Sequence, residues 1–90
     1  MLSNIDLVVR SKQEILFKNQ VFAVSSYNDK GIFDILSEHE NFISLIKDRV
    51  VIHKTRKDSQ EMKIENGILR VYRNKVYIYI NFKSLPGGGF

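Results

Sequence analysis

The sequence predicts an all-β protein: a flattened antiparallel sandwich or barrel of about eight to ten short strands, with no substantial helix. Hydrophobic and polar residues alternate with period two along most of the chain, which is typical of half-buried strands. Turn-forming residues separate these segments, and β-branched and aromatic residues fill them. The length of 90 residues, 43% of them hydrophobic, suits one globular domain.

The first third of the chain contains three predicted strands, at residues 5–10, 15–17 and 21–26. Polar segments separate and follow them, and we expect turns at residues 11–14, 18–20 and 27–31. In the second of these turns, Asn19 is the residue best suited after glycine to a left-handed backbone conformation.

The middle of the chain is organised around residues 31–46, which begin with a glycine that can take a positive φ without strain. Two short hydrophobic runs, 32–36 and 42–46, flank a compact polar loop that contains His39. We expect two short strands joined by this loop. A further strand at 49–55 and a polar hairpin tip at 56–60 follow.

The last third shows the clearest local signal for a hairpin. Asn66-Gly67 lies between two alternating segments, and this dipeptide predicts a tight turn joining two core strands. A second turn at residues 73–75 leads into a final strand that ends near residue 82. We expect the sandwich to span residues 1–84 and a Gly-rich tail to occupy residues 85–90.

The composition excludes several classes of protein. The chain has no cysteine, so neither a disulfide framework nor a thiolate zinc site is possible. The N-terminal segment lacks the apolar core of a signal peptide. No apolar run approaches the ~20 residues that a transmembrane helix needs, so we expect a soluble domain that can still dock onto a membrane-bound partner.

The net charge of +4 is compatible with three kinds of partner: nucleic acid, anionic lipid or an acidic protein. The densest basic region is residues 47–63, which we interpret as a solvated hairpin without a nucleic-acid role. Basic and aromatic residues also alternate over residues 72–79, as in proteins that bind single-stranded nucleic acid. We favour a half-exposed strand face there. A small basic barrel that binds RNA or single-stranded DNA, and a general protein-interaction sandwich, stay open as alternatives.

The residues that could perform catalysis are few. His39 and His53 lie in different predicted elements, and no motif places a base beside Ser25, Ser26 or Ser37. Glu38, His39 and Glu40 are consecutive, so on an extended chain their side chains point to opposite sides and do not converge on a metal. Gly87-Gly88-Gly89 opens no predicted helix and is not a phosphate loop. We therefore expect no catalytic residue, no metal site and no cofactor.

Three segments together resemble the N-terminal domain of the epsilon subunit of F-type ATP synthases, which is called delta in mitochondria. The loop region resembles the family's G-x-[FL]-G-[IV]-L-P-G-H-x-x-[LF] through five residues without a gap: Gly31, Ile35, Leu36, His39 and Phe42. Ser37-Glu38 replaces the family's Pro-Gly. Residues 5–21 and 64–80 resemble the family's opening and closing segments, so the resemblance covers about residues 5–82.

The resemblance implies a two-sheet sandwich of the central rotor stalk, with one end on the ring of membrane c subunits and one face against the gamma subunit. It implies a mechanical role that couples ring rotation to gamma, without bond chemistry. The expected ring contacts are Ile32, Glu38, His39, Glu40 and Phe42.

The resemblance also implies a peripheral location, on the cytoplasmic face of the bacterial inner membrane or the equivalent matrix or stroma face of an organelle. The family's C-terminal helical hairpin, which can bind ATP, has no counterpart after the last predicted strand. We therefore expect no autonomous nucleotide binding.

Overall fold

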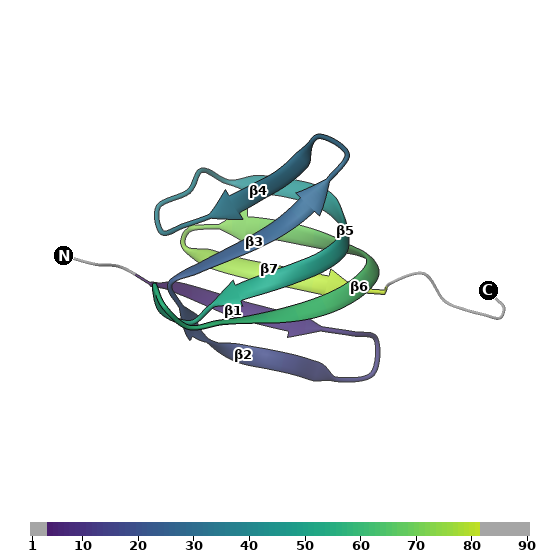
Figure 1. Ribbon diagram of the computed structural model, residues 1–90, viewed down its shortest axis with the longest axis horizontal. Helices are drawn as coiled ribbons and strands as arrows, with labels where there is room; N and C mark the ends of the chain where they lie inside the picture. The colour runs from purple at the N-terminus through teal and green to yellow at the C-terminus, as the bar shows by residue number, and fades with distance from the viewer. Residues whose placement is uncertain (1–3, 82–90) are drawn as a thin grey trace, which may run out of the picture.

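The computed structural model describes residues 4–81, which form seven strands and no helix (Figure 1). The prediction of an all-β fold is confirmed. The strands are β1 (Ile5–Arg10), β2 (Ile15–Val21), β3 (Ala23–Asn28), β4 (Gly31–Ile35), β5 (Phe42–His53), β6 (Ser59–Tyr72) and β7 (Lys75–Ile80). The Gly-rich tail predicted at 85–90 lies outside the described residues, so the predicted domain boundary stays a prediction.

All seven strands belong to one mixed sheet in the order β2-β1-β7-β6-β5-β3-β4. Five of the six neighbouring pairs are antiparallel, as predicted, but β1 and β7 are parallel. A tight turn can join only antiparallel neighbours, and β1 and β7 are instead joined by the whole intervening chain. Alternation within each strand carries no information about this pairing.

Two long strands make the sheet fold back on itself. β5 has 12 residues and β6 has 14, and their pairing shifts register between Lys47 and Asp48, where Asp48 takes a φ of 73°. The second half of β6 pairs with β7, whereas the second half of β5 pairs with β3 (Figure 1). The strands expected separately at 42–46 and 49–55 are therefore two halves of one bent strand, which lowers the strand count by one.

The prediction of a tight turn at Asn66-Gly67 is wrong, because both residues lie inside β6. Gly67 pairs with Ile46 on one side and Ile80 on the other, and its φ is not positive. A Cβ at Gly67 would lie 3.0 Å from the carbonyl oxygen of Tyr79 and 3.2 Å from Cγ1 of Ile46. Glycine is needed here for a close approach of neighbouring strands and not for a turn.

The turn predicted at residues 18–20 is also wrong, since β2 runs through Asn19 without a positive φ. β2 is an edge strand, so its polar residues face solvent without disturbing the core. The other predicted turns are confirmed. Gly31 has a φ of 118° after the β3–β4 turn, and Arg73 and Asn74 have φ values of 51° and 62° between β6 and β7.

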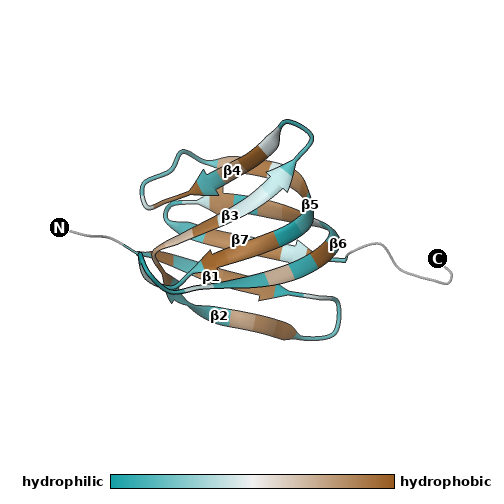
Figure 2. Cartoon of the chain, in the orientation of Figure 1, coloured by the Kyte–Doolittle hydropathy of each residue, from teal (hydrophilic) through white to brown (hydrophobic). Residues whose placement is uncertain are grey.

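A single hydrophobic core fills the space between the two halves of the folded sheet. Hydrophobic residues alternate with hydrophilic ones along the strands (Figure 2). Fifteen buried residues form one cluster: Ile5, Leu7, Val9, Val21, Val24, Ile35, Ile46, Val50, Ile52, Ile64, Leu69, Val71, Val76, Ile78 and Ile80. Full burial of one such side chain stabilises the fold by about 1.5–3 kcal/mol, so this cluster fixes which face of each strand points inward.

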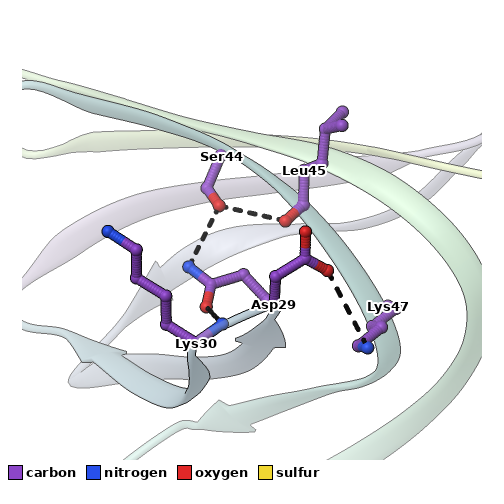
Figure 3. Close-up of polar contacts among 6 residues, drawn as sticks. Asp29, Lys30, Ser44, Leu45 and Lys47 are labelled. Carbon is purple, nitrogen blue, oxygen red and sulfur yellow. Dashed lines mark hydrogen bonds and ion pairs between the residues drawn. The ribbon is translucent and has the colours of Figure 1, made fainter.

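Polar contacts tie the β3–β4 turn to the first half of β5 (Figure 3). Asn28 Nδ2 donates to Ser44 Oγ at 3.2 Å, and Ser44 Oγ donates to the carbonyl of Leu45 at 3.0 Å. The Lys47 ammonium lies 3.9 Å from a carboxylate oxygen of Asp29, in an exposed pair that contributes little. The Leu45 side chain points away from these contacts (Figure 3).

Candidate functional site

The loop at residues 36–41, between β4 and β5, forms a tight turn despite lacking proline and glycine. The amide of His39 donates to the carbonyl of Leu36 at 3.3 Å, which closes a four-residue turn. Glu38, the third residue of that turn, has a φ of 64°. Type II turns require a positive φ at this position, where the family motif has glycine. The loop therefore keeps a tight shape with a residue that disfavours this backbone conformation.

Asn74 holds the strained turn in place from the neighbouring hairpin. Its Oδ1 accepts a hydrogen bond from the amide of Glu38 at 2.5 Å, and its carbonyl accepts one from the amide of Asp6 at 2.9 Å. Asn74 thus joins the loop to the β6–β7 turn and to the start of β1. The sequence resemblance does not identify this residue, because its partner lies 36 positions away.

His39 packs against the end of the core and does not project freely. Its ring meets Phe42 edge-on at 5.6 Å between centroids, and Phe42 meets Phe33 in the same way at 5.5 Å. Its Nδ1 lies 2.8 Å from the carbonyl oxygen of Glu40. Aromatic rings favour edge-to-face contacts, so the contacts of His39 with Phe42 and of Phe42 with Phe33 stabilise the loop against the end of the core.

The structure brings Glu38, His39 and Glu40 together in the loop but separates Ile32 from them. Glu38 and Glu40 are exposed, whereas His39 and Phe42 are half-buried. Ile32 is 62% exposed, but it lies near the beginning of β4, about 10 Å of strand away from Ile35 at its end. Of the five expected contact residues, the two glutamates are the ones best placed to meet a partner at this end of the domain.

A second candidate surface is the outer side of β5, β6 and β7, opposite the core. We use the name outer apolar face for Ile43, Leu45, Ile68, Tyr77 and Tyr79. Ile43 and Leu45 are 68% and 67% exposed, and Tyr77 and Tyr79 are also exposed. The register sets Leu45 beside Ile68 and Ile68 beside Tyr79, so these three residues form a continuous row across three strands.

One arginine lies within the outer apolar face and a second lies at its edge. Arg70 lies between Ile43 and Tyr77 in the register, and Arg10 lies beside Tyr79. Both arginines line a shallow hollow with Ile68 and the two tyrosines. Tyr77 and Tyr79, which alternate with other residues in the basic and aromatic segment 72–79, are therefore part of an apolar surface. The sequence could not identify this surface, because Ile43 and Leu45 belong to a hydrophobic run, 42–46, that alternation alone does not orient.

Ser25 lies between His53 and Asp34 on three adjacent strands. Its Oγ donates to Asp34 Oδ1 at 2.5 Å and lies 2.9 Å from His53 Nε2. Because the single hydroxyl proton goes to Asp34, Ser25 accepts from His53. An activated serine would instead donate its proton to the histidine. This cluster links β4, β3 and β5 and does not have the order of groups that acyl transfer needs.

Residues 4–81 contain no group of three acidic, histidine or cysteine side chains that could hold a metal ion. Within the same residues, no helix is long and apolar enough to cross a membrane.

The fold and its surfaces define a small, mixed-sheet β-sandwich whose notable features are a tight acidic loop and an exposed apolar face. This chain belongs to the family described as "ATP synthase, Delta/Epsilon chain, beta-sandwich domain", whose profile matches residues 4–82. The resemblance found in the sequence is thereby confirmed over nearly the whole chain.

Two solved structures share the fold. One is a chain of the Euglena gracilis mitochondrial ATP synthase, OSCP/F1/c-ring in rotational state 1, with a TM-score of 0.79 and 18% identity over 86% of this chain and 50% of that chain. The other is from the Tetrahymena thermophila mitochondrial ATP synthase, central stalk/c-ring, with a TM-score of 0.73 and 10% identity over 87% of this chain and 63% of that chain. The chain thus spans half to under two thirds of these relatives. The search of curated proteins gave no match.

Proposed function

We propose that this chain is a non-catalytic subunit of the central stalk of an F-type ATP synthase, which links the gamma subunit to the ring of c subunits. The observation that carries this proposal is the family match across residues 4–82, which includes the loop and the strands of the outer apolar face. The subunit works mechanically. It transmits rotation between two partners and is associated peripherally with the complex, on the cytoplasmic, matrix or stroma side.

The loop at 36–41 is the proposed contact with the ring. Glu38 and Glu40 are exposed there. Glu38 adds negative charge where the family motif has glycine, and Glu40 adds it directly after the motif's histidine. The turn hydrogen bond and the bond from Glu38 to Asn74 order the loop before any partner arrives. A pre-ordered loop loses less conformational entropy on docking than a flexible one. The carboxylates then favour a ring whose polar loops carry positive charge.

The outer apolar face is the proposed contact with gamma. Soluble domains rarely expose contiguous apolar patches without a partner, and this one combines aliphatic and aromatic residues with two arginines, Arg10 and Arg70. Aromatic and arginine side chains are common at the energetic centres of interfaces. The loop and the face belong to one sheet and one core, so a force applied at one reaches the other through the strands.

The test is reconstitution with gamma and the c-ring, scored by ATP-driven proton pumping. Changing Glu38 and Glu40 together to lysine should slow assembly and make coupling more sensitive to salt, because the reversed charges would repel a positive ring. Both residues are changed because one exposed ion pair contributes only about 0–1 kcal/mol. The matched control is the Glu14→Lys/Glu65→Lys variant, which makes the same change in charge at exposed positions outside the loop. Circular dichroism checks that both variants fold.

A separate variant tests the face. Leu45→Glu combined with Tyr79→Glu should abolish co-purification with gamma while leaving the fold intact, because both side chains are exposed.

Full pumping by the folded double-lysine variant would remove the loop as the ring contact. Failure of the unmodified chain to assemble with gamma and the ring would overturn the proposed function itself.

A further inference from the structure

The tip of the β5–β6 hairpin, residues 54–58, carries three cations whose role the proposed function does not explain. Lys54, Arg56 and Lys57 are all exposed, and Asp58 is the one acidic residue of the tip. The ion pairs found within residues 4–81 join Lys47 to Asp29 and Arg49 to Glu61. No ion pair among those residues therefore neutralises the three cations.

The tip is ordered by its own hydrogen bonds. Thr55 Oγ1 accepts from the amides of Lys57 and Asp58 at 3.2 and 3.1 Å. The amide of Lys54 donates to the carbonyl of Asp58 at 2.8 Å. The backbone that carries the cations is thus fixed, and binding an anion requires no folding of this loop.

A shallow pocket lies beside the tip and adds an apolar wall to the positive charge. It has a volume of about 450 Å³ and is lined by Asn4, Phe22, Lys54, Thr55, Arg56 and Lys57. The Arg56 guanidinium lies over the Phe22 ring, 5.3 Å from its centroid. Phe22 is held there through its amide, which donates to the carbonyl of His53 at 2.8 Å. An amphipathic phosphate compound matches this combination of cations and an aromatic ring better than a bare inorganic ion does.

The tip lies at the same end of the domain as the loop at 36–41 (Figure 1). The connection runs through Asn74, which accepts from the amides of Glu38 and Asp6. Two residues before Asp6, Asn4 lines the pocket of the tip. The cationic tip and the proposed ring contact therefore border one end of the sandwich.

We propose that the tip at 54–58 binds the anionic phosphate headgroups of the lipid bilayer that surrounds the ring. This inference rests on the proposed function, because it requires this end of the domain to face the membrane. The negative surface of a bilayer attracts each nearby lysine or arginine with a strength that corresponds to about a fivefold change in affinity. The cations thus orient the domain against the membrane while the loop engages the ring.

A lipid surface fits the tip better than a nucleic acid. Proteins that bind single strands offer several aromatic rings on which successive bases stack. Among residues 4–81, Phe22 is the one aromatic residue lining the pocket at the tip, and Arg56 already covers its ring. The exposed tyrosines of the outer apolar face, Tyr77 and Tyr79, lie on another strand, β7.

The experiment measures co-sedimentation of the full chain with vesicles of phosphatidylcholine alone, or of equal parts phosphatidylcholine and phosphatidylglycerol. We expect binding only to the anionic vesicles, decreasing as salt rises. The Lys54→Ala/Arg56→Ala/Lys57→Ala variant should bind more weakly by about fivefold for each cation removed. The matched control, Lys12→Ala/Lys18→Ala/Lys30→Ala, removes the same charge from exposed positions outside the tip and should bind as the unmodified chain does.

Three results would overturn the inference: equal binding to both vesicle types, equal losses in the two triple variants, or tighter binding to a single-stranded oligonucleotide than to anionic vesicles at the same salt. Circular dichroism confirms that both variants fold. Co-purification with gamma and the ring is measured separately. A tip variant that still assembles but no longer differs from the control on vesicles would refute the lipid contact and leave the proposed function standing.

Discussion

Glu38 adopts a backbone conformation that residues with a Cβ disfavour, and a single neighbour compensates for it. A left-handed conformation costs a residue other than glycine roughly 1–2 kcal/mol, and the φ of Glu38 is 64°. The hydrogen bond from its amide to Asn74 offsets part of this cost. The side chain at this position therefore contributes charge at the expense of stability, as residues at binding sites often do.

We expect Glu38→Gly to raise the free energy of unfolding by up to about 1 kcal/mol, because glycine accepts a positive φ without strain. Glu40→Gly is the matched control. Glu40 is also exposed in the same loop but is not among the residues with a positive φ, so its replacement should be neutral or destabilising. Urea unfolding of the three proteins measures the difference. If the two glycine variants have the same stability, Glu38 is not strained.

Among the elements, β6 depends on a close approach at its centre. Gly67 lies where the folded sheet brings Ile46 of β5 and the backbone of β7 near the same point. Any side chain there meets the carbonyl of Tyr79 at a distance that real Cβ contacts rarely show. The continuity of β6 through this point allows one strand to pair with both β5 and β7.

Gly67→Val should destabilise the domain by about 1–3 kcal/mol or more, because it overpacks a site with no free volume. Glu65→Val, at an exposed position two residues earlier in β6, is the control and should have a small effect. Thermal unfolding followed by circular dichroism compares the two variants with the unmodified chain. An unchanged midpoint for Gly67→Val would mean that β6 does not approach its neighbours so closely.

At the scale of the whole molecule, the proposed partner surfaces are arranged around a single core. The acidic loop and the cationic tip border one end, and the outer apolar face covers β5, β6 and β7. The hollows described on residues 4–81 are open and lined by strand and hairpin residues, without a glycine-rich turn that could enclose phosphates. We therefore expect the domain to act by contacting partners and not by enclosing a nucleotide.

Calorimetry with MgATP should accordingly show no saturable heat at micromolar concentrations of nucleotide. The backbone amides of Lys57 and Asp58, which could otherwise face a phosphate, already donate to Thr55. A dissociation constant in the low micromolar range would contradict this prediction. Repeating the titration with the Lys54→Ala/Arg56→Ala/Lys57→Ala variant would then show whether the nucleotide occupies the tip.

The sequence alone determined most of the strand segments, most of the turns and the family. Alternation places one side of each strand inward, and a hydrophobic core enforces that choice wherever one face is buried. The turns at 27–31 and 73–75 follow from residues that tolerate a positive φ, and both are confirmed. The acidic loop at 36–41 was likewise identified from its residues, because its tight turn closes within four positions.

The tertiary structure alone decided how the strands join and which surfaces remain exposed. Asn66-Gly67 carries a strong local turn signal, but pairing with β5 and β7 on both sides keeps it extended. The parallel β1–β7 pair, the support of Glu38 by Asn74 and the row from Leu45 to Tyr79 all join residues far apart in the chain. Local patterns cannot encode such contacts, because they depend on how the bent strands bring distant segments together.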